Sequence, residues 1–154
     1  MNKRLFKITF YPYLFGEHKF MSMSNNWFSI SDLTGAQALI DWFGIWPSFH
    51  DAELVDLTLI TQDKSHVTLH TWQTTKEIDK TGCFVTKKHV FVTFEMNGIT
   101  DLELRGFNHQ NVVSAVVLKK INEEIQLSLV NCFGLAGFIK CAQISVTFMP
   151  VEPS

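Results

Sequence analysis

The segment TGAQALIDWFGIWPSFHDAELVDLTLIT, residues 34–61, contains a change of hydrophobic period that decides the fold class. Its first part predicts a short α-helix. Thr34 and Gln37 form a capping-box pattern, and Gly44 stands where a glycine commonly ends a helix. The apolar residues between them recur at helical spacing and form one stripe, made of Ala36, Leu39, Ile40 and Phe43. We therefore expect one helix of about three turns, packed on one face of a sheet.

From Glu53 onward, apolar and polar residues alternate, which is typical of strands with one buried face. The clearest runs are ELVDLTLIT (53–61), SHVTLHTW (65–72), HVFVTFEM (89–96), ITDLELRGF (99–107) and the segments 116–118, 125–129 and 142–148. Asn97-Gly98 predicts a tight hairpin turn between two of them, and the polar residues 121–124 predict another. The sequence thus predicts an α+β fold, a mostly antiparallel sheet of about six or seven strands with one short helix packed on it.

The length of 154 residues corresponds to one domain. We expect a single domain over residues 26–149, followed by a short tail over residues 150–154. Residues 1–25 form an N-terminal extension that is either an additional strand or a consequence of an upstream start codon, since Met21 and Met23 are alternative starts.

The overall charge of −2 provides no basic surface for nucleic acid. No segment approaches the roughly 20 apolar residues that a membrane-spanning helix needs, and no signal-peptide cleavage pattern follows the first apolar run. The three cysteines, Cys83, Cys132 and Cys141, are odd in number and form no CxxC motif. This pattern favours a reducing cytoplasm over a disulfide framework, with Cys132 and Cys141 packed as small hydrophobic residues.

The motif WPSFHDAE, residues 46–53, supplies the first candidate site residues. In a structural interpretation, Pro47 prevents the helix from continuing, and Trp46 and Phe49 insert into the core at the corner. The polar residues then hydrogen-bond backbone groups of the turn. Two functional interpretations remain open. His50, Asp51 and Glu53 would either face a protein partner or serve as acid–base or metal-binding groups.

The motif FNHQN, residues 107–111, supplies the second set, because Asn108, His109 and Asn111 offer amide and imidazole groups in a loop after Gly106. These groups either bind a ligand or partner, or hydrogen-bond within their own turn. By contrast, His66 and His70 lie in a predicted strand, where about 13 Å separates residues four apart, so we expect no shared metal ion. The sequence has no GxSxG, Walker or GxGxxG motif, and we expect no cofactor and no enzymatic activity.

Three stretches together resemble the bacterial immunity protein 50 family of polymorphic toxin systems: GAQALIDWFGIWPSFHDAEL (35–54), EIDKTGCFVTKKHVFVTFEMNGITDLELRGFNHQN (77–111) and FGLAGFIKCAQISV (133–146). The similarity runs from about Trp27 to Val146. It implies a cytoplasmic protein that neutralises a cognate toxin by binding it, and it implies no catalytic residues. By motif match, the family signature consists of Trp46, Phe49, His50, Asp51, Glu53, Asn108, His109 and Asn111.

Two alternatives to toxin binding remain at this stage. One is a structural module that forms homo-oligomers through its sheet edges. The other is a metal-dependent enzyme that would use His50, Asp51, Glu53 and His109.

Overall fold

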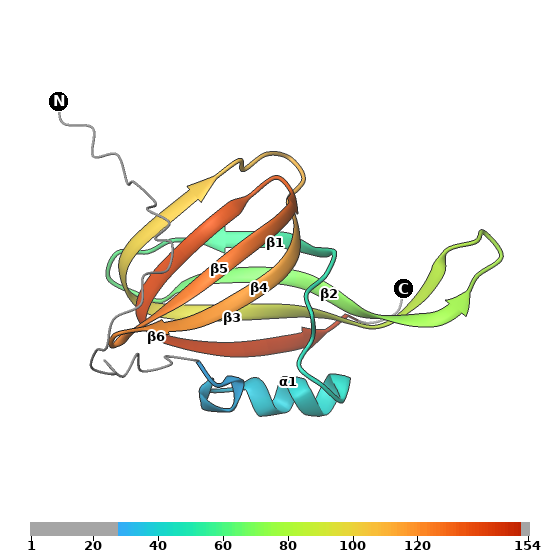
Figure 1. Cartoon of the computed structure of the whole chain (residues 1–154), viewed down its shortest axis with the longest axis horizontal. Helices are drawn as coiled ribbons and strands as arrows, with labels where there is room; N and C mark the ends of the chain where they lie inside the picture. Colours follow the sequence, from blue (N-terminus) through green and yellow to red (C-terminus); the bar gives the residue numbers. More distant parts are fainter. Residues whose placement is uncertain (1–27, 152–154) are drawn as a thin grey trace, which may run out of the picture.

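The computed structural model describes residues 28–151, and within this range six strands and one α-helix form the fold (Figure 1). The elements are a 3-10 turn η1 (Ile30–Asp32), α1 (Ala36–Phe43), β1 (Ala52–Thr58), β2 (Ser65–Ile78), β3 (Phe84–Arg105), β4 (Val112–Ile121), β5 (Glu124–Phe133) and β6 (Ala136–Pro150). The strands form an antiparallel barrel in the order β1-β2-β3-β6-β5-β4. The α+β class, the dominant antiparallel sheet and the single short helix are confirmed. The expected extension over residues 1–25 lies outside the described residues.

The interior of the barrel is filled by the alternating residues of its strands. On β3, Val90, Val92, Phe94 and Met96 are fully buried, while the residues between them are partly exposed. The two-residue period of a strand explains this pattern, because successive side chains point to opposite faces. The other strands contribute fully buried residues to the same core, among them Val67, Leu69, Val113, Leu127, Ile139 and Cys141.

The helix α1 begins differently from the sequence prediction. Gly35, in the left-handed conformation with φ of 89°, occupies the N-cap, and no side chain caps the helix, so the expected Thr34/Gln37 capping box is wrong. Gln37 instead donates to Asp41, one turn further along. The C-terminal prediction is confirmed, because Gly44 is left-handed and its N–H donates to the carbonyl of Ile40.

Thr34 has a tertiary role that explains its position. Its carbonyl accepts a 2.8 Å hydrogen bond from the N–H of Val146, and it forms a parallel bridge with Ser145. β5 pairs with β6 only as far as Cys141, so the chain before α1 pairs with part of the edge that β5 leaves open. The helix then runs alongside β6 (Figure 1) and buries Ala36, Leu39 and Phe43 in the core.

The expected hairpin turn at Asn97-Gly98 is wrong. β3 continues through this dipeptide from Phe84 to Arg105 and pairs with β6 on both sides of it. Gly98 has a positive φ of 64°, and the register with β6 shifts between Ile99 and Asp101. The dipeptide therefore marks an irregularity within one long strand, and this is why the chain has six strands over residues 28–151.

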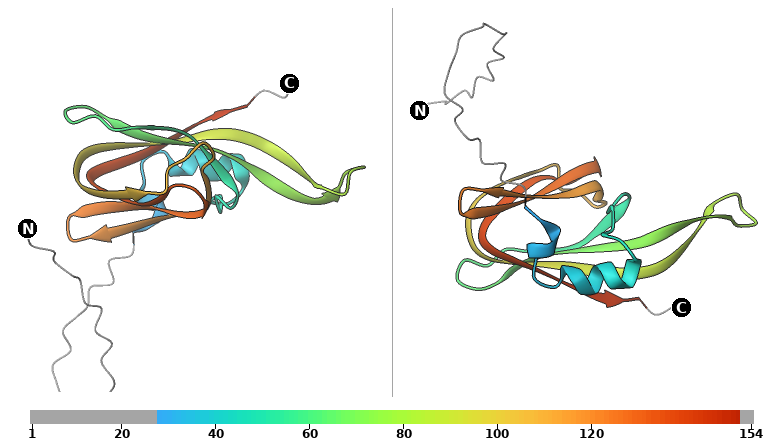
Figure 2. Two further views of the ribbon diagram at one scale, coloured as in Figure 1. Left: turned by 90° about the horizontal axis from the view of Figure 1, so that it is seen from above. Right: turned by 60° about the horizontal axis from the view of Figure 1, so that its bottom comes forward.

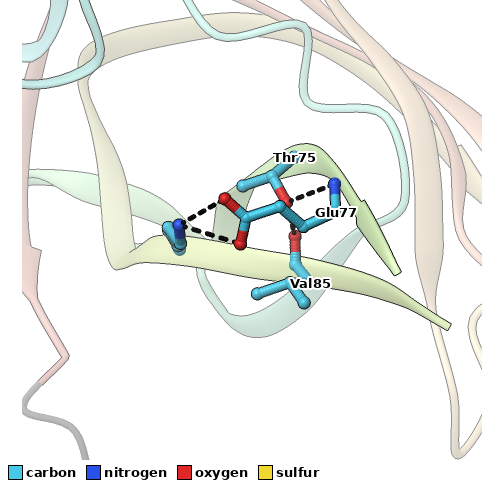
Figure 3. A network of polar contacts seen from close by, with 4 residues as sticks. Thr75, Glu77 and Val85 are labelled. Atoms are coloured by element: carbon cyan, nitrogen blue, oxygen red, sulfur yellow. Dashed lines mark hydrogen bonds and ion pairs between the residues drawn. The ribbon is translucent and has the colours of Figure 1, made fainter. Parts of the chain in front are cut away.

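The β2–β3 hairpin extends beyond the barrel as an arm, which we define as residues 73–88 (Figures 1 and 2). β1 pairs with β2 only up to His70, and β6 pairs with β3 only from Val90. Among residues 28–151, the arm strands therefore pair only with each other. Figure 3 shows polar contacts that link them. The Thr75 hydroxyl donates to the Val85 carbonyl at 2.9 Å, and Glu77 forms a 3.3 Å ion pair with Lys87.

Candidate functional site

The WPSFHDAE corner connects α1 to β1 and carries its aromatic residues inward. Phe49 is 1% exposed and lies 5.7 Å from Phe94 between ring centroids. Trp46 packs edge-on against Phe49, also at 5.7 Å. Phe49 and Asp51 both have positive φ, 57° and 63°, a conformation that costs a non-glycine residue energy. Burial of the Phe49 ring offsets this cost, so the predicted corner with its aromatic side in the core is observed.

The polar residues of the same corner point to solvent. His50 and Asp51 are 65% and 59% exposed, and the His50 Nδ1 lies 2.9 Å from an Asp51 carboxylate oxygen. The thiol of Cys132, on β5, lies 3.9 Å from the other carboxylate oxygen of Asp51. Cys132 is exposed, so its predicted packing as a small hydrophobic residue is wrong, whereas that of Cys141 is confirmed. Exposed in this way, the His50 and Asp51 side chains are available to a partner.

The FNHQN loop, which connects β3 to β4, hydrogen-bonds mainly to itself. The Asn111 side chain accepts from the N–H of Asn108 and donates to the Asn108 carbonyl. It also accepts a 2.9 Å hydrogen bond from the N–H of Leu135, in the turn before β6. Asn111 is 8% exposed, whereas His109 and Gln110 are exposed. The two asparagines thus organise the loop, and His109 is the signature residue of this loop that faces solvent.

The fold brings the two motifs together at one place, the seam between β1 and β4. Ala52 pairs with Val113 and Glu53 with Val112, and the N–H of Leu54 donates to the Asn111 carbonyl at 2.8 Å. Of the eight predicted residues, Trp46, Phe49, Asn108 and Asn111 support the structure. The exposed members are His50, Asp51, Glu53 and His109.

An open hollow of about 660 Å³ lies beside this seam. β1 forms one wall and the FNHQN loop forms the other, and the lining residues are Leu54, Val55, Asp56, Leu57, Phe107, Asn108, His109 and Asn111. Val55 and Phe107 are 53% and 68% exposed. Neither residue stands out in the sequence as a site residue, because only the fold shows that their side chains border the same hollow.

The histidines of β2 have separate partners. His66 contacts the Asp56 carboxylate at 2.7 Å, whereas the His70 Nε2 lies 3.1 Å from the His89 Nδ1. Within residues 28–151, no group of three His, Cys, Asp or Glu side chains is arranged to hold a metal ion. The described residues therefore offer no candidate metal centre around His50 or His109.

A cluster of aromatic and imidazole rings on the outer face of β2 and β3 was also not predicted from the sequence. His70 lies within 5.3 Å, between ring centroids, of Trp72, His89 and Phe91, and Trp72 stacks on His89. Burial and the neighbouring His89 lower the pKa of His70, whereas Glu53 opposes this effect. These residues alternate along each strand, but their proximity depends on the β2–β3 register, which the sequence does not specify.

Comparison with known proteins identifies the family. No curated protein and no solved structure matches the chain significantly. None of the helices within residues 28–151 is long and apolar enough to cross a membrane. The model of the immunity protein 50 family matches residues 35–151, which is well over half of the chain and includes both signature motifs. The resemblance inferred from the motifs is thus confirmed, and the chain belongs to the immunity protein 50 family.

Proposed function

We propose that this protein binds a cognate polymorphic toxin and neutralises it by occlusion, without catalysing a reaction of its own. The observation that carries this proposal is the family match over residues 35–151. Occlusion needs affinity and a matching surface rather than reactive groups. We place the protein in the cytoplasm, where exposed free thiols such as Cys83 and Cys132 stay reduced.

We further propose that the exposed signature residues His50, Asp51, Glu53 and His109 contact the toxin. They lie at the β1–β4 seam, and the buried signature residues hold the backbone beneath them. Trp46, Phe49, Asn108 and Asn111 then contribute indirectly, by fixing the corner and the loop. Two carboxylates at this position favour a basic partner surface, because complementary charge accelerates association and selects among partners.

Co-expression with the polymorphic toxin encoded beside the gene tests the proposal. We expect cells that express the toxin alone to die and cells that express both proteins to survive. The two purified proteins should also elute as one complex in size-exclusion chromatography. A folded, soluble protein that neither rescues growth nor forms this complex would refute the proposed function.

A second candidate function, homo-oligomerisation, is favoured by the tip of the arm. Ile78 and Phe84 pair across this tip and are 64% and 62% exposed. Asp79 closes the turn between them, because its carboxylate accepts hydrogen bonds from Thr81 and Cys83, which also lower its pKa. Light scattering decides this question. A particle larger than a monomer that dissociates in the Ile78→Ser variant would support oligomerisation through the arm.

A further inference from the structure

The backbone pairing of β1 differs on its two edges. On one edge, β1 pairs with β2 from Glu53 to Thr58, with a register shift between Leu54 and Asp56 that leaves Val55 without a partner on β2. On the outer edge, β4 pairs only with Ala52 and Glu53, and one further bond joins Leu54 to Asn111. Because the pairing is antiparallel, the segment that faces β1 beyond Leu54 is the FNHQN loop, which precedes β4 and forms no strand ladder with β1. Among the described residues, none forms a strand ladder with the outer edge of β1 beyond Leu54.

The hollow beside the seam lies where the ladder stops. Residues 54–57 of β1 form one wall of this 660 Å³ hollow, and residues of the FNHQN loop face them. A segment laid along this wall would continue the ladder that β4 begins. Strand addition of this kind draws affinity from backbone hydrogen bonds and specificity from the alternating side chains. Val55 and Phe107 provide exposed apolar surface for those side chains.

Among the residues that line the hollow, Asp56 is the one carboxylate, and none is a lysine or an arginine. Residues 44–63 contain four carboxylates and no lysine or arginine, and residues 107–118 contain no charged residue apart from the titratable His109. Asp51, Glu53 and Asp56 are all exposed on or beside β1. Two of them contact histidines, His50 and His66, which are charged only when protonated. This edge therefore attracts a segment with lysine or arginine side chains and repels an acidic one.

We propose that the outer edge of β1, from Leu54 to Thr58, accepts an extended, basic segment of the toxin as an additional strand. This inference rests on the proposed function, and it specifies where and how the toxin binds. In this proposal, the backbone hydrogen bonds of the ladder provide affinity, and the exposed apolar and acidic side chains provide specificity for the toxin segment. Asp56 and Glu53 select the basic segment, while Val55 and Phe107 cover its apolar side chains.

The test compares two exposed strand valines, of which Val55 lines the hollow and Val130 does not. Val55→Lys places a positive charge in the hollow, whereas Val130→Lys places the same charge on β5, where Val130 is 45% exposed. We expect Val55→Lys to weaken binding of the adjacent toxin by about 100-fold, the range of a hot-spot residue, and Val130→Lys by less than about 3-fold. Phe107→Ala, in a loop, provides a second variant that does not alter any strand, and it should weaken binding at least about 5-fold.

Hydrogen exchange of the full-length chain tests the strand addition itself. In the complex, the amides of residues 55–58 that point away from β2 should exchange more slowly than in the free protein, because the added strand protects them. Slower exchange confined to the arm, residues 73–88, would overturn the inference. So would protection, in the free monomer, of those amides of residues 55–58 that point away from β2, since another segment of the chain would then occupy the edge. A free dimer that Val55→Lys dissociates would also overturn it, because a second copy would be the occupant.

The failure of this inference is distinct from the failure of the proposed function. If the wild-type protein binds the toxin and Val55→Lys and Phe107→Ala bind equally well, the immunity function stands and the β1 edge is not its interface. If the wild-type protein does not bind the toxin, both proposals are wrong. Raising the salt concentration should weaken the wild-type complex, because exposed charges are screened.

Discussion

Asn111 and Leu135 are joined by a 2.9 Å hydrogen bond from the Leu135 backbone N–H to the Asn111 side-chain oxygen. The same oxygen accepts from the N–H of Asn108, so one buried amide links the FNHQN loop to the turn between β5 and β6. This amide also fixes the backbone that accepts the N–H of Leu54. Asn111 therefore supports the loop side of the seam at which we place the toxin.

The Asn111→Ala substitution should lower the free energy of unfolding by about 1–3 kcal/mol, because it leaves the buried Leu135 N–H without an acceptor. Urea denaturation measures this difference. The matched control is Gln110→Ala, at the exposed neighbouring position, which should change the stability by less than about 0.5 kcal/mol. Equal effects of the two substitutions would contradict the role of the Asn111 side chain.

Gly35 and Gly44 flank α1, and both are left-handed, with φ of 89° and 87°. Alanine at either position should cost about 1–2 kcal/mol for this conformation. At Gly35 a Cβ atom would also overlap the Val146 carbonyl oxygen, whereas at Gly44 it would meet no atom within 4 Å. We expect Gly35→Ala to cost about 1–3 kcal/mol more than Gly44→Ala, since β6 must shift to accept it.

Thermal and urea unfolding of both glycine variants measure this difference. If Gly44→Ala proves as destabilising as Gly35→Ala, the close approach of Gly35 to β6 does not contribute to stability.

The lowered pKa of His70 predicts a pH-dependent stability. The folded protein resists protonation of His70 because of burial and the neighbouring His89. The unfolded chain takes up this proton near pH 6.5, the ordinary value of histidine. The contribution of neutral His70 to the free energy of unfolding is therefore fully present above pH 6.5 and is lost as the pH falls below this value.

Urea denaturation of the wild type and of His70→Gln at pH 8 and pH 5 measures this effect. Since glutamine does not titrate, the variant should lose less stability than the wild type between these two pH values. A loss of equal size in both proteins would refute the contribution of His70.

The three cysteines should differ in their reactivity toward alkylating reagents. Cys83 and Cys132 are exposed, whereas Cys141 is fully buried and its burial raises the pKa of the thiol to about 11. Because the thiolate is the reactive form, we expect two rapidly alkylated cysteines in the native protein and a third after denaturation. Mass spectrometry of the alkylated peptides identifies them. Rapid native alkylation of Cys141 would show that the barrel interior opens readily.

The sequence determined the features of this protein that depend on local periodicity. The apolar stripe of α1 and its end at Gly44 follow from the spacing of residues 36–44, and the buried faces of β2 and β3 follow from the alternation. The inward position of Phe49 follows from the large aromatic residues beside Pro47, which prevents the helix from continuing. These patterns act over a few residues, so they are visible without knowledge of the fold.

Only the tertiary structure decided the features that depend on which segments meet. The sequence around Thr34 predicts a helix cap. In the structure, Thr34 instead pairs with Ser145, because β5 leaves that edge of β6 open. Asn97-Gly98 has a turn sequence, yet continuous pairing with β6 keeps it within β3. The meeting of Leu54 with Asn111 and the hollow between Val55 and Phe107 likewise require barrel closure. Contacts between distant residues set strand register and pairing, and local sequence preferences are too weak to specify them.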